Sequence, residues 1–403
     1  MKEKRKAPKP NTPDAPEQAA LKGKKRPRFL LRLIAAALIL AVALGAVAAV
    51  VYRDRLNADS IKRWFRYRTL TLSDNGQAES FPYDGELTDT FAALDGDLLV
   101  CSRNAVSLYS ASGTRYVSQP VSMDHPVVTE NGSLAAVYDA GGSALYVLGQ
   151  RQLIWTAEGL EGILSARLNK SGMLTVVTQG SGSRGTVTVY DSAYAPLVSV
   201  KLTSAYVMDA ALSDDGKTLA IVTVGQEGGS FSSALALYTL NTGAGGDFTP
   251  DLTCSLGSGA VLDVRHTADR LWALSDVGLT VTDRAGDTVS VSWEGRYLKR
   301  YTLAGDGFAA ALLGKYRAGS QAELWVVSAD GGKAVLDCRE QVLALSAAGR
   351  YLAVLTGSRL DIYTADLTLY ASLDDTQGAR NVLMRSDGSA MLIAPDAAHY
   401  YVP

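Results

Sequence analysis

The chain has 403 residues, 47% of them hydrophobic, and its formal net charge of −2 hides an uneven distribution. Residues 1–32 contain 11 Lys and Arg, whereas residues 69–403 contain 22 basic and 36 acidic residues, a net charge of −14. A domain with that much negative charge repels phosphate backbones, so we expect no nucleic acid partner.

The first segment, residues 1–28, is rich in Lys, Pro and Ala and has almost no large apolar side chains. Such a composition cannot bury enough apolar surface to offset the conformational entropy of folding. We therefore predict a disordered basic tail, whose charges suit an anionic membrane surface.

A long apolar run follows at residues 29–52, with no charged residue between Leu33 and Val51. At a helical rise of about 1.5 Å per residue, a run of this length covers the roughly 30 Å hydrocarbon core of a bilayer. We predict one membrane-spanning helix, which makes the lipid bilayer a partner of the chain. The alternative is a cleaved signal peptide, because Ala46, Val47 and Ala48 resemble a cleavage site.

Basic residues are more numerous before this run than after it, with 11 in residues 1–32 and six in residues 53–68. The positive-inside rule then places the N terminus in the cytoplasm and the rest of the chain outside the cell membrane. Residues 53–66 predict a short juxtamembrane stalk helix. Its N-cap would be Asp59 or Ser60, with Ile61, Trp64 and Phe65 on one side.

After residue 85 a four-part pattern repeats about eight times, roughly every 40 residues. A hairpin turn, usually marked by Gly, joins the first two apolar segments, and a third segment ends in aromatic or β-branched residues. The third segments are Val106–Tyr109, Leu145–Leu148, Val187–Tyr190, Leu235–Tyr238, Leu279–Thr282, Leu324–Val327, Leu360–Tyr363 and His399–Val402. Four strands per repeat predict an all-β fold, an eight-bladed β-propeller over residues 67–403.

The last repeat stops at Pro403, directly after its third segment, and so lacks a fourth strand. An alternating segment upstream of the first repeat, Tyr67–Leu72, is available to fill that place. We predict that it closes the ring, because an open ring would leave unpaired edges on its first and last blades. Seven blades are the alternative if residues 241–262 or the irregular fifth repeat do not form a blade.

Polar residues stand at one place in most repeats, seven residues before the Gly of the first turn. In a propeller this is the start of the innermost strand, where side chains surround the central channel. The candidate channel ring is Asp89, His125, Ser165, Asp209, Asp263, Arg300 and Asn381, and Val342 interrupts it. The ring would bind a small ligand or cation on the axis, or it is the polar lining that wet strand ends require.

Catalytic and cofactor motifs are absent from the sequence, which has no GxSxG, HExxH, Walker or EF-hand pattern. Two acidic pairs occur, but Asp214-Asp215-Gly216 reads as a hairpin turn and Asp374-Asp375 as a loop between blades. We therefore expect no catalytic residue, no cofactor, no bound metal and no enzyme activity.

Residues Ala211–Val222, ALSDDGKTLAIV, resemble the strand-turn-strand unit of WD40-like and TolB-like propeller repeats. The Gly-His and Trp-Asp marks of true WD40 repeats are missing, so the resemblance does not extend to their eukaryotic scaffold functions. The order of basic tail, apolar helix, stalk and eight degenerate repeats is similar to a family of uncharacterised, membrane-anchored bacterial propellers of clostridial type. That family carries no catalytic residues to transfer.

Together these features predict a non-catalytic, extracytoplasmic propeller that binds or scaffolds a protein or cell-envelope component through one face. The alternative is a sensor that binds a small ligand or cation in its central funnel.

Overall fold

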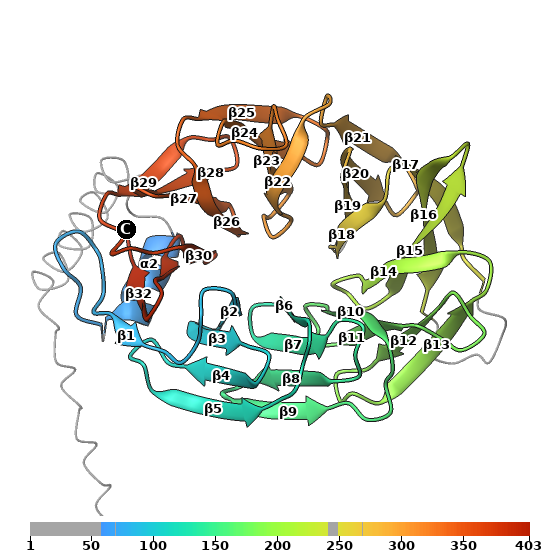
Figure 1. The fold of residues 1–403 in the computed structure, drawn as a ribbon, viewed down its shortest axis with the longest axis horizontal. Helices are drawn as coiled ribbons and strands as arrows, with labels where there is room; N and C mark the ends of the chain where they lie inside the picture. Colours follow the sequence, from blue (N-terminus) through green and yellow to red (C-terminus); the bar gives the residue numbers. More distant parts are fainter. Residues whose placement is uncertain (1–57, 69, 241–248, 268) are drawn as a thin grey trace, which may run out of the picture. The chain divides into compact units, whose positions relative to one another are not determined.

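The structure, a computed structural model, describes residues 58–68, 70–240, 249–267 and 269–403 (Figure 1). The chain divides between Ser60 and Ile61, and the account below concerns Ile61–Pro403. The predicted tail 1–28, the predicted membrane span 29–52 and the first part of the predicted stalk lie outside the described residues. Within the described ranges, no helix combines the length and apolar character needed to cross a bilayer.

Eight four-stranded antiparallel sheets surround a central axis and form an eight-bladed β-propeller, as predicted (Figure 1). From the inside outward, blades 1 to 4 consist of β2 (Thr90–Leu94), β3 (Asp97–Cys101), β4 (Ala105–Tyr109) and β5 (Arg115–Pro120); β6 (Pro126–Glu130), β7 (Leu134–Asp139), β8 (Leu145–Gly149) and β9 (Gln152–Thr156); β10 (Ile163–Leu168), β11 (Leu174–Thr178), β12 (Gly185–Tyr190) and β13 (Pro196–Leu202); and β14 (Tyr206–Leu212), β15 (Thr218–Glu227), β16 (Ser230–Thr239) and β17 (Leu252–Ser258).

Blades 5 to 8 continue in the same order. They consist of β18 (Val261–His266), β19 (Arg270–Ser275), β20 (Gly278–Asp283) and β21 (Thr288–Ser292); β22 (Tyr297–Thr302), β23 (Phe308–Gly314), β24 (Ala322–Ser328) and β25 (Lys333–Cys338); β26 (Val342–Ala348), β27 (Tyr351–Thr356), β28 (Leu360–Thr364) and β29 (Leu369–Leu373); and β30 (Asn381–Met384), β31 (Ala390–Ile393), β32 (Ala397–Tyr401) and β1 (Phe81–Pro82). The irregular fifth repeat forms a complete blade, so the seven-bladed alternative is wrong.

An N-terminal strand closes the last blade, but it is not the predicted segment Tyr67–Leu72. The fourth strand of blade 8 is β1, whose Phe81 pairs with Ala398 of β32. Tyr67 instead ends helix α2 (Ala58–Tyr67), and its buried side chain packs against blade 8. The true closing strand has only two residues and contains a proline, so it has no alternating pattern for sequence analysis to detect.

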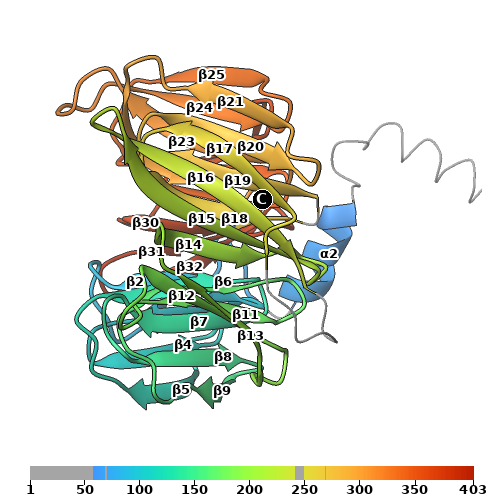
Figure 2. The ribbon, with the colours of Figure 1, turned by 90° about the vertical axis from the view of Figure 1, so that its right-hand side faces the viewer.

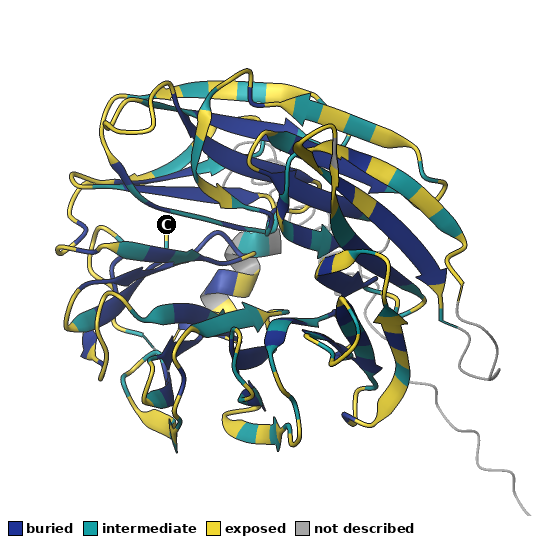
Figure 3. Cartoon of the chain, turned by 45° about the vertical axis from the view of Figure 1, so that its right-hand side comes forward, coloured by how far each residue is buried: buried dark blue, intermediate teal, exposed yellow. Residues whose placement is uncertain are grey.

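Apolar side chains fill the spaces between neighbouring blades. Among the described residues there are eight buried apolar clusters, one for each pair of adjacent blades, including the pair formed by blades 8 and 1. Neighbouring blades cover both faces of a middle strand, so all of β3 is buried, whereas the outermost strand β21 alternates exposed and half-buried residues. Figure 3 shows the same difference between the buried middle strands and the partly exposed outermost strands.

The antiparallel order sorts the connections onto two faces of the propeller. We call the face with the first-to-second and third-to-fourth turns the hairpin face, and the face with the second-to-third and fourth-to-first connections the loop face. Helix α2 lies on the hairpin face, where Arg63 and Arg66 contact Asp387 in the β30–β31 turn (Figure 2). The tips of the β15–β16 and β23–β24 hairpins lie on the opposite side of the ring.

Candidate functional site: the central channel

A β-bulge recurs in the innermost strands of blades 3 to 7. The strand pairing shifts between Ile163 and Ser165, Val207 and Asp209, Val261 and Asp263, Leu298 and Arg300, and Val342 and Ala344. The residue after the bulge is therefore a predicted ring residue in four consecutive blades. In blade 7 the equivalent residue is Ala344 rather than Val342, because the β26–β27 turn from Ala348 to Tyr351 is tighter than the corresponding turns of blades 3 to 6.

Each bulge adds one unpaired residue near the mouth of the channel on the loop face. These five residues are Leu164, Met208, Leu262, Lys299 and Leu343. Bulges bend a strand and redirect its side chains, and they are frequent beside functional sites. Met208 and Leu262 are exposed, whereas Leu164 and Leu343 pack against the buried clusters between blades.

Two of the predicted ring residues, Asp209 and Asp263, meet in the channel through a third residue, Arg167 of β10. The Arg167 guanidinium donates from Nε and Nη2 to the Asp209 carboxylate at 2.9 and 2.5 Å, and Nη2 also lies 2.5 Å from Asp263 Oδ1. The three side chains come from blades 3, 4 and 5. Asp209 is buried, so these charge-assisted hydrogen bonds satisfy a carboxylate that water scarcely reaches.

Sequence reasoning missed Arg167. It stands two residues after Ser165 on the same strand, and alternation along a strand puts both side chains on one side of the sheet. That spacing is the signal that could have added it to the candidate ring. Without the fold, nothing indicates that its side chain reaches across two neighbouring blades.

Electrostatics in the channel are set by burial and by this contact. Burial raises the pKa of Asp263, and the Arg167 charge opposes that rise. Burial alone would lower the pKa of Arg167, but Asp209 and Asp263 raise it above its ordinary value, so the guanidinium stays charged. Burial also raises the pKa of Tyr138 and of Tyr301 to about 12, so both phenols are neutral near pH 7.

The structure does not bring the other five ring residues into this cluster. Asp89 accepts a hydrogen bond from the Glu86 amide, and the exposed His125 donates its own amide to Asp139. Asn381 accepts from the neighbouring Val382 amide, and Arg300 is exposed. The buried Ser165 hydroxyl has no hydrogen-bond partner among the described residues.

The described residues contain no group of three or more His, Cys, Asp or Glu side chains arranged to hold a metal ion. Asp209 and Asp263, the two carboxylates of the candidate ring that meet in the channel, are both engaged by Arg167. This arrangement joins three blades chemically. Two acidic residues at one register suggest a cation site in the sequence. In the structure both carboxylates already bind the Arg167 guanidinium, so they are less available to a cation.

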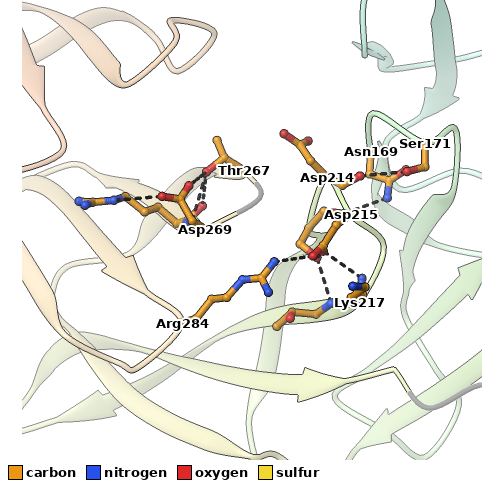
Figure 4. A network of polar contacts seen from close by, with 11 residues as sticks. Asn169, Ser171, Asp214, Asp215, Lys217, Thr267, Asp269 and Arg284 are labelled. Atoms are coloured by element: carbon orange, nitrogen blue, oxygen red, sulfur yellow. Dashed lines mark hydrogen bonds and ion pairs between the residues drawn. The ribbon is translucent and has the colours of Figure 1, made fainter.

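On the hairpin face, the turns of neighbouring blades are joined by hydrogen bonds (Figure 4). Asn169 donates to the Ser213 carbonyl at 2.9 Å, and Arg284 forms a 2.7 Å ion pair with Asp215. Hydrogen bonds from Ser213 and Arg284 hold the pKa of Asp215 below its ordinary value. Asp214 pairs with Lys170 at 3.2 Å. The two carboxylates thus serve the hairpin turn and its neighbours, as the sequence pattern indicated.

A shallow pocket of about 330 Å³ lies beside this network, at the turns of blades 3 to 6. Acidic and basic side chains line it in equal number, namely Asp214, Asp269, Asp306, Lys170, Arg265 and Arg270. Its charges largely balance, and it presents no single sign of charge to a ligand.

Residues 75–249 match a family described as a family of unknown function, DUF5711. The match spans less than half of the chain, and with the propeller fold it supports the expectation of an uncharacterised β-propeller family. Membrane anchoring and the clostridial type of that family stay predictions. No curated protein matches the sequence.

Two solved propellers are similar in fold. The C-terminal WD40 domain of Sif2 has a TM-score of 0.54 at 13% identity, over 79% of this chain and 98% of that one. BamB from Moraxella catarrhalis has a TM-score of 0.50 at 16% identity, over 81% of this chain and 99% of that one. Identities this low show the fold alone, and that fold agrees with the predicted WD40-like repeats.

Proposed function

We propose that this chain is a non-catalytic binding propeller, held at the outer side of a cell membrane by residues 29–52, that presents its loop face to a protein or cell-envelope partner. Propellers are common interaction modules, and the similar WD40 fold supports that part of the proposal. The channel supports it as well, because its two central carboxylates are engaged by Arg167 rather than left for a ligand.

The observation that carries the proposal is the attachment of helix α2 to the hairpin face. Arg63 donates to the Asp387 carbonyl at 2.7 Å, and Arg66 pairs with the Asp387 carboxylate at 3.0 Å. The Tyr67 hydroxyl lies 2.7 Å from Ser389 Oγ, and its ring packs on Tyr400 with the centroids 5.5 Å apart. The helix is thus fixed to blade 8 by contacts that are largely buried.

The apolar run ends at Tyr52, and nine residues later Ile61 begins the part of α2 that belongs to the propeller unit. Nine residues span at most roughly 30 Å when fully extended. The hairpin face of blade 8 is thus tied through this short linker to the segment proposed as the anchor. The proposal therefore assigns partner binding to the opposite face, the loop face.

Membrane topology tests the first half of this proposal. Cysteines introduced at Asn11 in the tail and at Ser320 on the loop face are treated with a membrane-impermeant maleimide in intact cells. We expect labelling of the Ser320→Cys variant in intact cells, and of the Asn11→Cys variant only after lysis. The parent chain is the control for its own three cysteines. The reverse pattern, or labelling of neither position before lysis, would reject the extracytoplasmic placement.

The binding role is tested by site-specific photo-crosslinking in cells. A photoreactive amino acid replaces Ser320 on the loop face or Leu197 on the outer strand β13. The proposal expects one discrete adduct with an envelope protein from position 320 and none from position 197. Equal adducts from both positions, or none from either, would remove the support for a loop-face binding role.

A further inference from the structure

Large apolar side chains are exposed together on the loop face of blades 4 to 6, where Phe231 and Tyr316 are 64% and 61% exposed. Exposed apolar residues also occur on outer strands, for example Leu197 on β13 and Val335 on β25. A clustered apolar surface marks an interaction site, whereas single exposed residues need no explanation. The loop-face patch consists of Tyr206, Met208, Phe231, Leu262, Val277, Tyr297 and Tyr316.

Backbone contacts make the patch continuous across blade boundaries. Gly259 donates its amide to the Phe231 carbonyl at 3.0 Å, and its backbone approaches Val277 so closely that a Cβ there would lie 2.8 Å from Val277 Cγ2. The Val277 carbonyl in turn accepts from the Trp293 amide at 2.9 Å. These contacts join blade 4 to blade 5, and the chain continues from Trp293 to Tyr297 of blade 6 within four residues.

Basic side chains accompany the aromatic rings of the patch. The Arg184 guanidinium carbon lies 4.6 Å from the centre of the Tyr206 ring, and that of Arg317 lies 5.8 Å from the centre of the Tyr297 ring. Lys315 Nζ lies 5.7 Å from the centre of the Tyr316 ring. Within the described part of the chain, no carboxylate forms an ion pair with Arg184, Lys315 or Arg317, so their positive charges face solvent.

The charge of this region is opposite to that of the domain. The loop-face connections from β11 to β24 contain four basic residues and two acidic ones. Arg296 and Glu294 form an ion pair at 3.2 Å. The remaining charged residues of these connections are the basic Arg184, Lys315 and Arg317 and the acidic Asp276. Residues 69–403 as a whole carry a net charge of −14. The loop-face patch is thus a small positive, aromatic region on a negative domain.

We propose that the loop-face patch binds a short acidic peptide segment of a partner protein that carries large apolar side chains. This inference rests on the proposed binding role and names the chemistry of the partner. The exposed rings would cover the partner's apolar side chains, and the three unpaired cations would face its carboxylates.

The surrounding charge favours a short segment over a long polyanion. At physiological ionic strength electrostatic interactions are screened over about 8 Å. A peptide that stays within the patch therefore meets mainly its positive charge. A nucleic acid or a phosphate-rich polymer would extend beyond the patch onto the acidic surface and be repelled there.

The test is selection of peptides from a random twelve-residue phage-displayed library on the full-length chain in lipid nanodiscs. Enriched peptides are then synthesised, and their binding is measured by fluorescence anisotropy. We expect negatively charged peptides containing Phe, Trp or Leu. Their affinity should fall at least tenfold in the Arg184→Glu/Arg317→Glu variant and in the Phe231→Ser/Tyr316→Ser variant, and it should fall as salt is raised.

The matched control is Leu197→Ser/Val335→Ser, which changes two exposed apolar residues of outer strands and should leave affinity unchanged. Thermal unfolding of each variant verifies that the propeller is folded, and the exposed positions make large losses unexpected. Enrichment of basic or uncharged peptides, no enrichment, or binding that survives both patch variants would overturn the proposal. So would a dimer that dissociates on Arg184→Glu/Arg317→Glu, because the occupant would then be a second copy.

The purified chain separates this inference from the membrane topology. A cytoplasmic propeller would contradict the proposed location and leave peptide binding unaffected. Peptide binding that fails while the topology holds would contradict the partner chemistry alone.

Discussion

Arg167 of blade 3 contacts Asp209 of blade 4 through both Nε and Nη2, and the same Nη2 reaches Asp263 of blade 5. One cation thus joins the innermost strands of three consecutive blades. Two carboxylates would repel each other in the channel without it, and Asp209 has little water to screen its charge. These contacts in the channel therefore help to hold blades 3, 4 and 5 together.

Removal of this cation should destabilise the propeller. We expect Arg167→Met to lower the free energy of unfolding by about 3 to 5 kcal/mol, the usual cost when one partner of a buried ion pair is lost. Urea denaturation followed by circular dichroism measures it. Lys170→Met, which breaks the exposed Lys170–Asp214 pair, is the matched control and should cost less than about 1 kcal/mol.

A triple variant distinguishes charge from shape at the same place. Arg167→Met/Asp209→Asn/Asp263→Asn removes all three charges, and it should recover more than half of the stability lost in Arg167→Met. No recovery would mean that packing of the guanidinium, rather than neutralisation of the carboxylates, accounts for the loss.

Closure of the ring should depend on Phe81, which is 3% exposed and lies in the cluster between blades 8 and 1. Phe81→Ala should cost about 3 to 5 kcal/mol, because it leaves a cavity at blade 8, in which β1 pairs with strands from the C-terminal end of the propeller. The control is Phe231→Ala, a change of the same size at an exposed position. Equal effects of the two variants on urea unfolding would show that β1 is not needed for closure.

The attachment of α2 should weaken in acid through Asp387. Burial would raise the pKa of this carboxyl, but hydrogen bonds from Ser389 and the charges of Arg385 and Arg66 lower it below its ordinary value of 3.8. Its stabilising contribution is therefore present above pH 3.8 and is lost as pH falls through the lower folded-state pKa. Limited proteolysis with an acid-active protease should cut at α2 more readily over this range.

Two variants check the role of Asp387. Asp387→Asn should make the helix equally accessible at all pH values tested. Tyr67→Phe, which removes the hydroxyl bonded to Ser389, should cost about 1 kcal/mol and keep the pH dependence. If α2 of the parent chain stayed resistant to the protease at low pH, the proposed role of Asp387 in holding the helix would be contradicted.

A second pH effect should begin near neutrality, because two buried histidines are favoured in the neutral form. Burial lowers the pKa of His266 and of His399 below the ordinary value of 6.5. The unfolded chain takes up these protons first, so the free energy of unfolding should fall as pH drops below 6.5. The slope is at most about 1.4 kcal/mol per pH unit for each histidine, down to the folded-state pKa.

The double variant His266→Gln/His399→Gln should flatten stability between pH 6.5 and 4.5, measured by urea denaturation. His125→Gln is the control, since that side chain is exposed. A parent chain whose stability does not change over this interval would contradict the prediction.

The sequence predicted the blades because their information is local. Repeated apolar segments and turn residues such as Asp215-Gly216 specify hairpins whose paired strands lie within about ten residues of each other. Eight such units bury their apolar faces by packing side by side in a ring. The predicted Asp214-Asp215 turn follows from the same short-range pattern. Of the candidate ring, Asp209 and Asp263 share one register in adjacent blades and meet at Arg167. A ligand for the ring stays a prediction.

Tertiary structure decided everything that depends on contacts between blades. Closure by Phe81–Pro82 rather than Tyr67–Leu72, the bridge from Arg167 to two other blades, and the joining of Phe231 and Tyr316 in one surface involve residues 42 to more than 300 positions apart. No local pattern encodes such distances, because the ring alone brings those strand ends together. The repeat determined the architecture, and the packing of the blades determined which side chains meet.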